Sequence, residues 1–89
     1  MIKQPIIIIN KLGLHARAAA KFVTLASKFH CDVNLNRGTR SVNGKSIMAV
    51  MLLAAAKGTE LEIITHGKDE QEALTALVTL INDRFDEIE

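Results

Sequence analysis

His15 and Arg17 are the two side chains of this sequence best placed to do chemistry together. They stand just after Gly13, where a β-branched run gives way to an alanine-rich run. A helix beginning at or just after His15 would leave unpaired backbone N–H groups, and the positive end of its dipole, beside the imidazole. Arginine adds forked donors that match phosphate oxygens. The pattern indicates a histidine that carries an anion, with phosphate the obvious candidate, and an ordinary loop or cap histidine is the alternative.

Ser46 is the second candidate, because it follows a turn at residues 43–44 and precedes a short apolar run. As the N-cap of a helix, serine would contribute about 1 kcal/mol. As a phosphorylation site, it would place up to two negative charges against helix amides, enough to repel an acidic partner. The residues alone favour the cap. By default Ile47, Met48 and Met51 belong to the core, and only if exposed would they form an adaptable docking patch.

The remaining histidines and the one cysteine suggest no further site. Cys31 alternates with apolar Val33, which predicts a buried thiol, and a lone cysteine excludes an internal disulfide or a cysteine-based zinc site. His30 and His66 lack any comparable setting and are expected at the surface. We therefore expect no metal site and no cofactor.

Length and composition narrow the class of protein. Eighty-nine residues predict one domain, residues 1–89. A formal net charge of +1 gives no electrostatic footprint for nucleic acid or for an anionic membrane, and three phenylalanines are too few aromatics for base stacking. The apolar run Ile6–Ile9 is far too short to span a bilayer. We expect a cytoplasmic protein with no nucleic-acid partner and no membrane insertion.

The elements that must position these side chains follow from the spacing of apolar residues. Strand character is seen in residues 2–9, 31–36, 40–42 and 61–66. Helical spacing is seen in residues 16–29, 46–53 and 69–81. Pro5 predicts an edge position or a bulge in the first strand, and Asp69 with Glu72 resembles a capping box. The order β-α-β-β-α-β-α predicts a two-layer α+β sandwich in which helices cover the dry face of the sheet.

Two segments resemble the signatures of a known family. Residues 14–19 (LHARAA) are similar to the histidine phosphorylation signature of the HPr family, the phosphocarriers of the bacterial phosphoenolpyruvate-dependent phosphotransferase system. Residues 42–51 (VNGKSIMAVM) are similar to its serine-centred signature. The resemblance covers essentially the whole chain. It implies an open-faced β-sandwich, with a four-stranded antiparallel sheet covered on one face by three helices.

The resemblance also implies a role for each site residue. His15 would accept phosphate through Nδ1 from phosphorylated enzyme I and pass it to enzyme IIA-type acceptors, with Arg17 neutralising the phosphoryl group. The chain would be a monomeric, stoichiometric carrier and not an enzyme. Ser46 matches the residue that HPr kinase/phosphorylase modifies in some members. Partner docking would use the side chains of Ala20, Ile47, Met48 and Met51.

One departure from the family pattern bears on which branch of the system the chain serves. Ala18 replaces the usual proline, which makes the first helical turn less rigid but removes no reactive group. A regulatory docking module of the nitrogen-related branch, controlled by its phosphorylation state, is therefore the main alternative. A small-molecule-binding α+β domain is a third hypothesis, and it predicts no covalent phosphate on His15.

Overall fold

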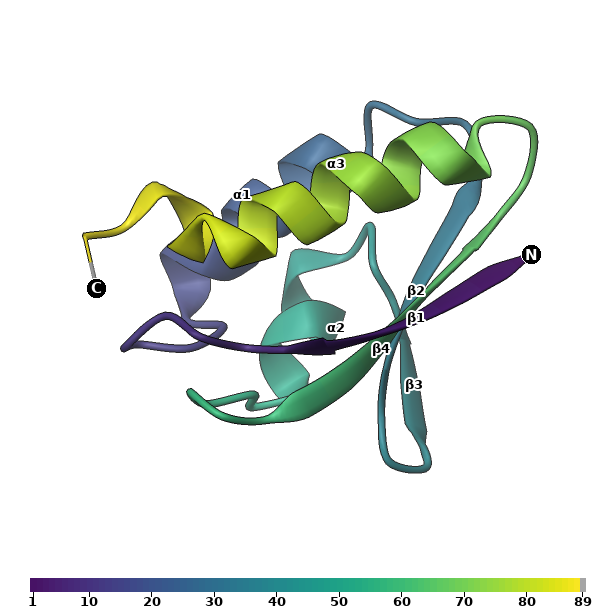
Figure 1. The fold of residues 1–89 in the computed structure, drawn as a ribbon. Coiled ribbons are helices and arrows are strands. Elements are labelled where there is room, and N and C mark those ends of the chain that lie inside the picture. Colours follow the sequence, from purple (N-terminus) through teal and green to yellow (C-terminus); the bar gives the residue numbers. More distant parts are fainter. Residues whose placement is uncertain (89) are drawn as a thin grey trace.

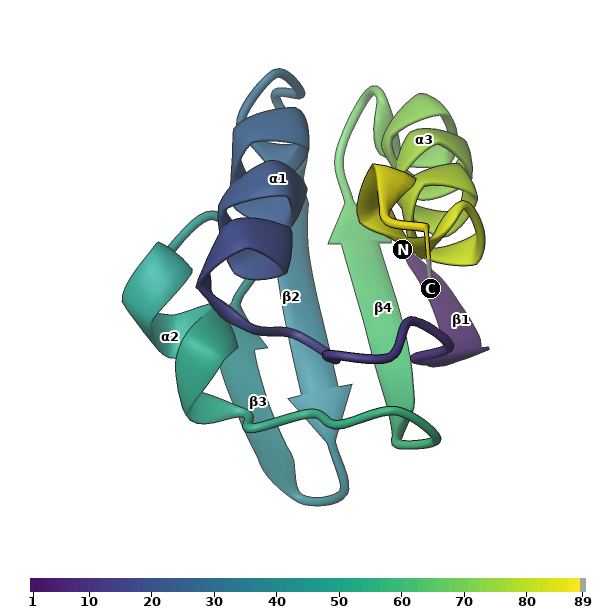
Figure 2. The same ribbon diagram turned by 90° about the vertical axis from the view of Figure 1, so that its left-hand side faces the viewer.

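A four-stranded antiparallel sheet carries three α-helices on one of its faces within residues 1–88, the part of the chain that the computed structural model describes (Figures 1 and 2). In chain order the elements are β1 (Ile2–Ile7), α1 (Ala16–Ala26), β2 (Asp32–Arg37), β3 (Arg40–Asn43), α2 (Ile47–Leu52), β4 (Glu60–His66), α3 (Glu70–Asn82) and the short 3-10 helix η1 (Arg84–Asp86). The predicted order and fold class are confirmed. Of the helices and strands within residues 1–88, only η1 was not predicted.

The strands are arranged in the order β1-β4-β2-β3, so β1 and β3 form the two edges. Pro5 lies in β1 opposite Glu62 of β4, and the predicted edge position of this proline is confirmed. An edge suits proline because it has no N–H to donate to a further strand. In the middle of the sheet, Leu35 of β2 lies opposite Ile63 of β4, and both side chains are buried.

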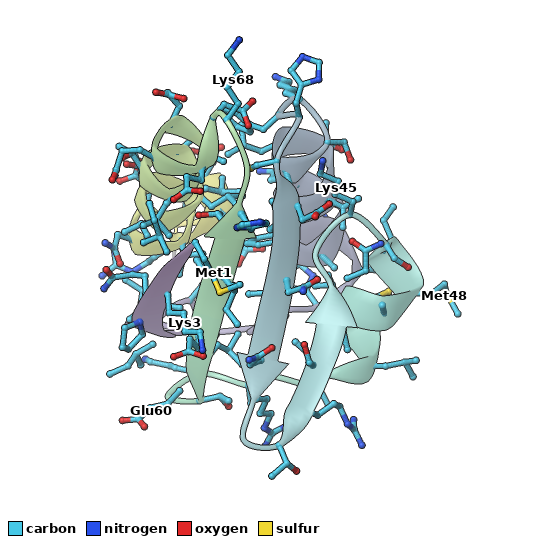
Figure 3. All side chains as sticks on the ribbon, turned by 90° about the vertical axis from the view of Figure 1, so that its right-hand side faces the viewer. Met1, Lys3, Lys45, Met48, Glu60 and Lys68 are labelled. Carbon is cyan, nitrogen blue, oxygen red and sulfur yellow. The ribbon has the colours of Figure 1, made fainter. Side chains whose placement is uncertain are left out.

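The core lies between the sheet and the helices because the two central strands, β2 and β4, alternate buried residues with more exposed ones. Phe22 of α1 and Phe85 of η1 are fully buried in it, and Cys31 is buried as predicted. The opposite face of the sheet is open and mostly polar, as the side chains in Figure 3 show around Lys3. No helix within residues 1–88 is long and apolar enough to cross a membrane.

The predicted capping box at the start of α3 is wrong. Asp69 is the N-cap residue, but its side chain makes no bond to the helix. Its carboxylate oxygens instead accept from the backbone N–H groups of His30 and Cys31, each at 2.8 Å. These two N–H groups follow α1 and compete successfully for the carboxylate. Asp69 therefore ties the α1–β2 turn to α3 rather than capping α3.

Candidate functional site

The segment before α1 fixes where His15 enters the helix. Gly13 has φ +67°, and a Cβ atom there would lie 2.5 Å from the carbonyl oxygen of Ala55. The Leu14 N–H donates to that same oxygen at 2.8 Å. Only glycine fits such a close approach in this conformation. His15 follows as the N-cap of α1 with extended backbone (φ −73°, ψ 178°), as predicted.

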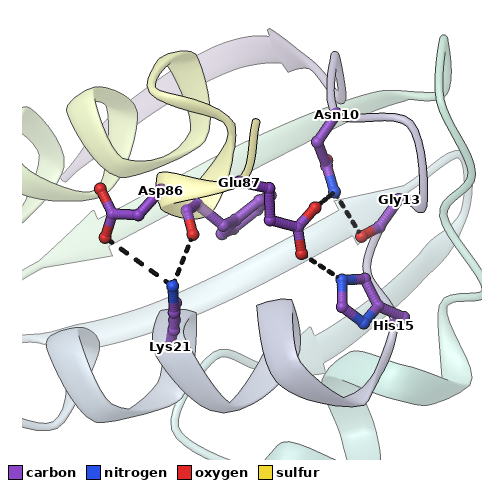
Figure 4. A network of polar contacts seen from close by, with 7 residues as sticks. Asn10, Gly13, His15, Lys21, Asp86 and Glu87 are labelled. Atoms are coloured by element: carbon purple, nitrogen blue, oxygen red, sulfur yellow. Dashed lines mark hydrogen bonds and ion pairs between the residues drawn. The ribbon is translucent and has the colours of Figure 1, made fainter. Parts of the chain in front are cut away.

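The imidazole of His15 is held by a polar network (Figure 4). Nε2 contacts one carboxylate oxygen of Glu87, and the two side chains are 27% and 12% exposed. The other oxygen of Glu87 accepts from Asn10 Nδ2 at 2.9 Å. The same Asn10 nitrogen donates to the carbonyl of Gly13 at 2.8 Å, and Asn10 is fully buried. Two segments distant in sequence, residues 10–15 and the segment that contains Glu87, therefore meet at one histidine.

The charge state of Glu87 decides which nitrogen of His15 carries a proton. Burial alone would raise the pKa of this carboxyl. Hydrogen bonds from Asn10 and His15, with the positive charges of His15 and Arg17, outweigh that cost and hold its pKa below the usual range. An ionised carboxylate only accepts, so Nε2 must donate. In the neutral ring Nδ1 then keeps its lone pair, and within residues 1–88 it has no hydrogen-bond partner.

Arg17 lies on the exposed first turn of α1, close enough to act electrostatically on Glu87. Among residues 1–88 it makes no hydrogen bond or ion pair, so its guanidinium is available to an anion. It lines a groove together with Lys11, Leu12, Lys21, Asp86, Glu87 and Ile88. The His15 side chain does not cap α1, so the first N–H groups of the helix also remain available. His15 and Arg17 therefore both lie at the N-terminal end of α1.

Around Ser46 the predicted N-cap is confirmed, because its Oγ accepts from the Ala49 N–H at 3.3 Å. The default expectation that the apolar residues of α2 belong to the core is wrong. Only Val50 is buried in this helix, while four neighbours are well exposed: Ile47 (42%), Met48 (71%), Met51 (39%) and Leu52 (65%). Figure 3 shows Met48 projecting from α2. A six-residue helix at the edge of the helical layer has too few contacts to bury its other faces.

Known proteins match the chain along most of its length. A family described as "PTS HPr component phosphorylation site" matches residues 2–83. The chain belongs to the HPr family. It is 65% identical over 83 residues to the phosphocarrier protein HPr of Pseudomonas aeruginosa, covering 92% of each chain. It is 58% identical over 87 residues to that of Neisseria meningitidis, covering 98% of each. The crystal structure of HPr-C-His from Thermoanaerobacter tengcongensis superposes with a TM-score of 0.96 and 44% identity, covering 100% of both chains.

In this HPr-family chain the roles of Asn10 and Glu87 were not predicted from the sequence. They lie 77 residues apart, and no local pattern relates them. The available signals were a polar residue ending a run of isoleucines and a phenylalanine among charges near the C-terminus. Phe85 is fully buried, and Lys21 Nζ donates to its carbonyl at 2.8 Å. These contacts bring Glu87 over the start of α1.

Two arginines of the β2–β3 hairpin hold the end of α2, and they were also missed. Arg37 Nη1 donates to the carbonyl of Leu53 at 2.6 Å and, more weakly, to that of Ala54 at 3.2 Å. Arg40 Nη1 donates to the carbonyl of Leu52 at 2.7 Å. Cations at a helix C-terminus satisfy the last carbonyls and oppose the dipole. The apolar surface of α2 is thereby fixed in orientation.

Among the residues that the structure describes, no group of three or more His, Cys, Asp or Glu side chains is arranged to hold a metal ion. The groups gathered at His15 are an arginine, helix N–H groups and a single carboxylate. The arginine and the helix N–H groups are donors for an oxyanion, while the carboxylate accepts from the imidazole.

Proposed function

We propose that this HPr-family chain carries a phosphoryl group on Nδ1 of His15, accepts it from phosphorylated enzyme I and passes it to enzyme IIA-type acceptors. The observation that supports this most strongly is the engagement of Nε2 by Glu87. It leaves Nδ1 as the unpartnered ring nitrogen among residues 1–88. A neutral imidazole nitrogen with a lone pair is a competent nucleophile toward phosphorus.

The transfer step needs positioning and charge stabilisation more than proton movement. The lone pair of Nδ1 forms the new N–P bond as the bond between phosphorus and the donor nitrogen breaks, and that electron pair returns to the donor. The phosphoryl oxygens would lie against the first N–H groups of α1 and the guanidinium of Arg17, which are preorganised for negative charge. The reverse geometry serves the next acceptor equally well.

A relay must hold its cargo weakly enough to release it. The proposed site is open to solvent on the side of Arg17, and it has one arginine rather than an enclosing cluster. We therefore propose a stoichiometric, monomeric carrier in the cytoplasm and not an enzyme with its own substrate pocket.

The exposed apolar residues of α2 are the proposed docking surface for both partners, together with half-buried Ala20 of α1. Ser46 borders this surface as the N-cap of α2. We propose that phosphorylation of Ser46 by HPr kinase/phosphorylase is a regulatory event. A phosphate there would add negative charge beside the docking surface and would repel an acidic partner.

Incubation with phosphoenolpyruvate and enzyme I tests the proposed carriage directly. We expect one phosphate per chain, labile in acid and stable in alkali, on the wild type and none on His15→Ala. The same mixture with an enzyme IIA-type domain should then transfer the label. An unlabelled wild type, or equal labelling of His15→Ala, would overturn the proposal.

A further inference from the structure

The C-terminal segment after α3 is fastened over α1 at several points. Arg84, Phe85 and Asp86 all have positive φ angles (57°, 53° and 64°), which L-residues adopt only when the surroundings hold them there. Here the buried ring of Phe85 and the bond from Lys21 Nζ to its carbonyl supply that hold. The chain then becomes extended at Glu87, which directs its carboxylate onto the imidazole of His15.

We propose that Glu87, oriented by Asn10, is a positioning residue that keeps the proton of neutral His15 on Nε2 and so leaves Nδ1 free to attack phosphorus. The inference rests on the proposed phosphoryl transfer at His15 and adds a mechanism for choosing the reacting nitrogen. Neither of the two signature segments, residues 14–19 and 42–51, contains Asn10 or Glu87.

In the network around His15, the positions of the partners determine which group donates and which accepts in each hydrogen bond. Asn10 Nδ2 has two hydrogens, and the carbonyl of Gly13 and Glu87 Oε1 accept them. The second oxygen of Glu87 is therefore the one presented to Nε2 of His15. Because an ionised carboxylate cannot donate, the ring nitrogen that faces it must carry the proton. Second partners fix the tautomer of metal-bound histidines in the same way.

The carboxylate also assists during the transfer itself. When Nδ1 forms the N–P bond, the ring gains positive charge while Nε2 keeps its proton. A half-buried carboxylate hydrogen-bonded to Nε2 stabilises that charge without accepting the proton, as in hydrolase triads. On release, the bonding pair returns to Nδ1 and the ring is neutral again. No proton enters or leaves the site in either direction.

Glu87→Gln is the most discriminating test, because it preserves the size of the side chain and can place a hydrogen-bond donor, in place of an acceptor, opposite Nε2. An amide presents only one oxygen. If that oxygen stays on the Asn10 amide, its NH2 group faces Nε2, which must then accept, and the proton moves to Nδ1. Removing the partners that orient metal-bound histidines costs about 10- to 100-fold. We expect single-turnover phosphotransfer from enzyme I to slow by about that factor.

Ring-labelled 15N NMR of the unphosphorylated protein reads the tautomer directly. We expect the Nε2–H tautomer in the neutral wild type and a shift toward the Nδ1–H tautomer in Glu87→Gln. The melting temperature of Glu87→Gln should lie within a few degrees of that of the wild type. Glu72→Gln is the matched control, because it makes the same chemical change at an exposed residue in the first turn of α3. It should retain both the wild-type tautomer and the wild-type rate.

Each outcome separates this inference from the proposed function. A wild type that is phosphorylated at His15 but has its neutral proton on Nδ1 overturns the inference even if Glu87→Gln does not fold. Wild-type rate and tautomer in a folded Glu87→Gln overturn it as well, while the carrier function stands. A wild type that accepts no phosphate removes the proposed function itself.

Discussion

Replacement of Asn10 by alanine tests how far the His15 network supports the fold. Asn10 is fully buried and makes two side-chain hydrogen bonds, at 2.8 Å to the Gly13 carbonyl and at 2.9 Å to the Glu87 carboxylate. A neutral bond contributes about 0.5–1.5 kcal/mol and one to a charged group about 1.5–3 kcal/mol. We therefore expect Asn10→Ala to lower the free energy of unfolding by about 2–4.5 kcal/mol.

Urea unfolding at pH 7, followed by circular dichroism, measures this loss. Asn36→Ala is the matched control, since Asn36 has only one long side-chain bond, at 3.5 Å to Glu62. Both amides also have a buried Oδ1 atom without a partner among residues 1–88, so that feature cancels in the comparison. We expect Asn36→Ala to change stability by less than about 0.5 kcal/mol.

A double-mutant cycle with Glu87→Ala isolates the bond between Asn10 and Glu87. We expect a coupling energy of about 1–3 kcal/mol, as for groups in direct contact. If Asn10→Ala costs no more than Asn36→Ala, or if the cycle gives no coupling, the network does not hold the C-terminal segment and the reasoning fails.

Four further predictions concern the site, the charges, the first turn of α1 and the docking surface. Arg17→Ala should slow phosphotransfer at least tenfold and leave thermal unfolding unchanged, because the exposed guanidinium has no partner among residues 1–88; an equal loss of stability would contradict its role. The hydrogen bond from the backbone N–H of His30 is the main cause that lowers the pKa of Asp69 in the folded protein. The carboxylate therefore stabilises the fold fully at pH values above its pKa in the unfolded chain, and this stabilisation is lost as the pH falls through its pKa in the folded protein. The midpoint concentration of urea should therefore decrease as the pH is lowered below about 4, and this decrease should be smaller in Asp69→Asn. Ala18→Pro should raise the melting temperature by about 2–8 °C if the first turn accepts the ring, and a lower melting temperature would show that it does not. Met48→Lys should raise the KM of phosphorylated enzyme I for this chain and leave its stability unchanged. Asn34→Lys, on the open face of the sheet, should change neither quantity. Equal effects of the two substitutions would exclude α2 as the docking surface.

The sequence predicts the fold well because the fold depends on local periodicity. The alternation of Cys31, Val33 and Leu35 gives a strand with one buried face, and the structure buries all three. The start of α1 is also local, since Gly13 and the alanine run mark it. Boundaries differ by a few residues because helix and strand ends depend on tertiary contacts.

The site is predicted only in part, for the opposite reason. His15 and Arg17 share one short segment, and their spacing carries the signal. Asn10 and Glu87 meet only because the chain folds both ends toward α1, and that contact spans 77 residues. Asp69 shows the same effect, because the capping pattern is local while its true partners, the N–H groups of His30 and Cys31, lie nearly 40 residues away.

The exposure of α2 could not be predicted from its own residues. Its apolar composition is that of a core helix, and only its position at the edge of the helical layer leaves Met48 in solvent. The exposed apolar surface of α2 is therefore a property of the fold and not of the composition of this helix.

The most direct test of the proposed mechanism identifies the ring nitrogen of His15 that carries the phosphate. The chain, labelled with 15N in its histidine rings and phosphorylated by enzyme I and phosphoenolpyruvate, can be examined by 31P and 15N NMR. We predict one-bond phosphorus–nitrogen coupling at Nδ1 of His15 and a proton retained on Nε2. Phosphorus bonded to Nε2, or no phosphohistidine at residue 15, would contradict it.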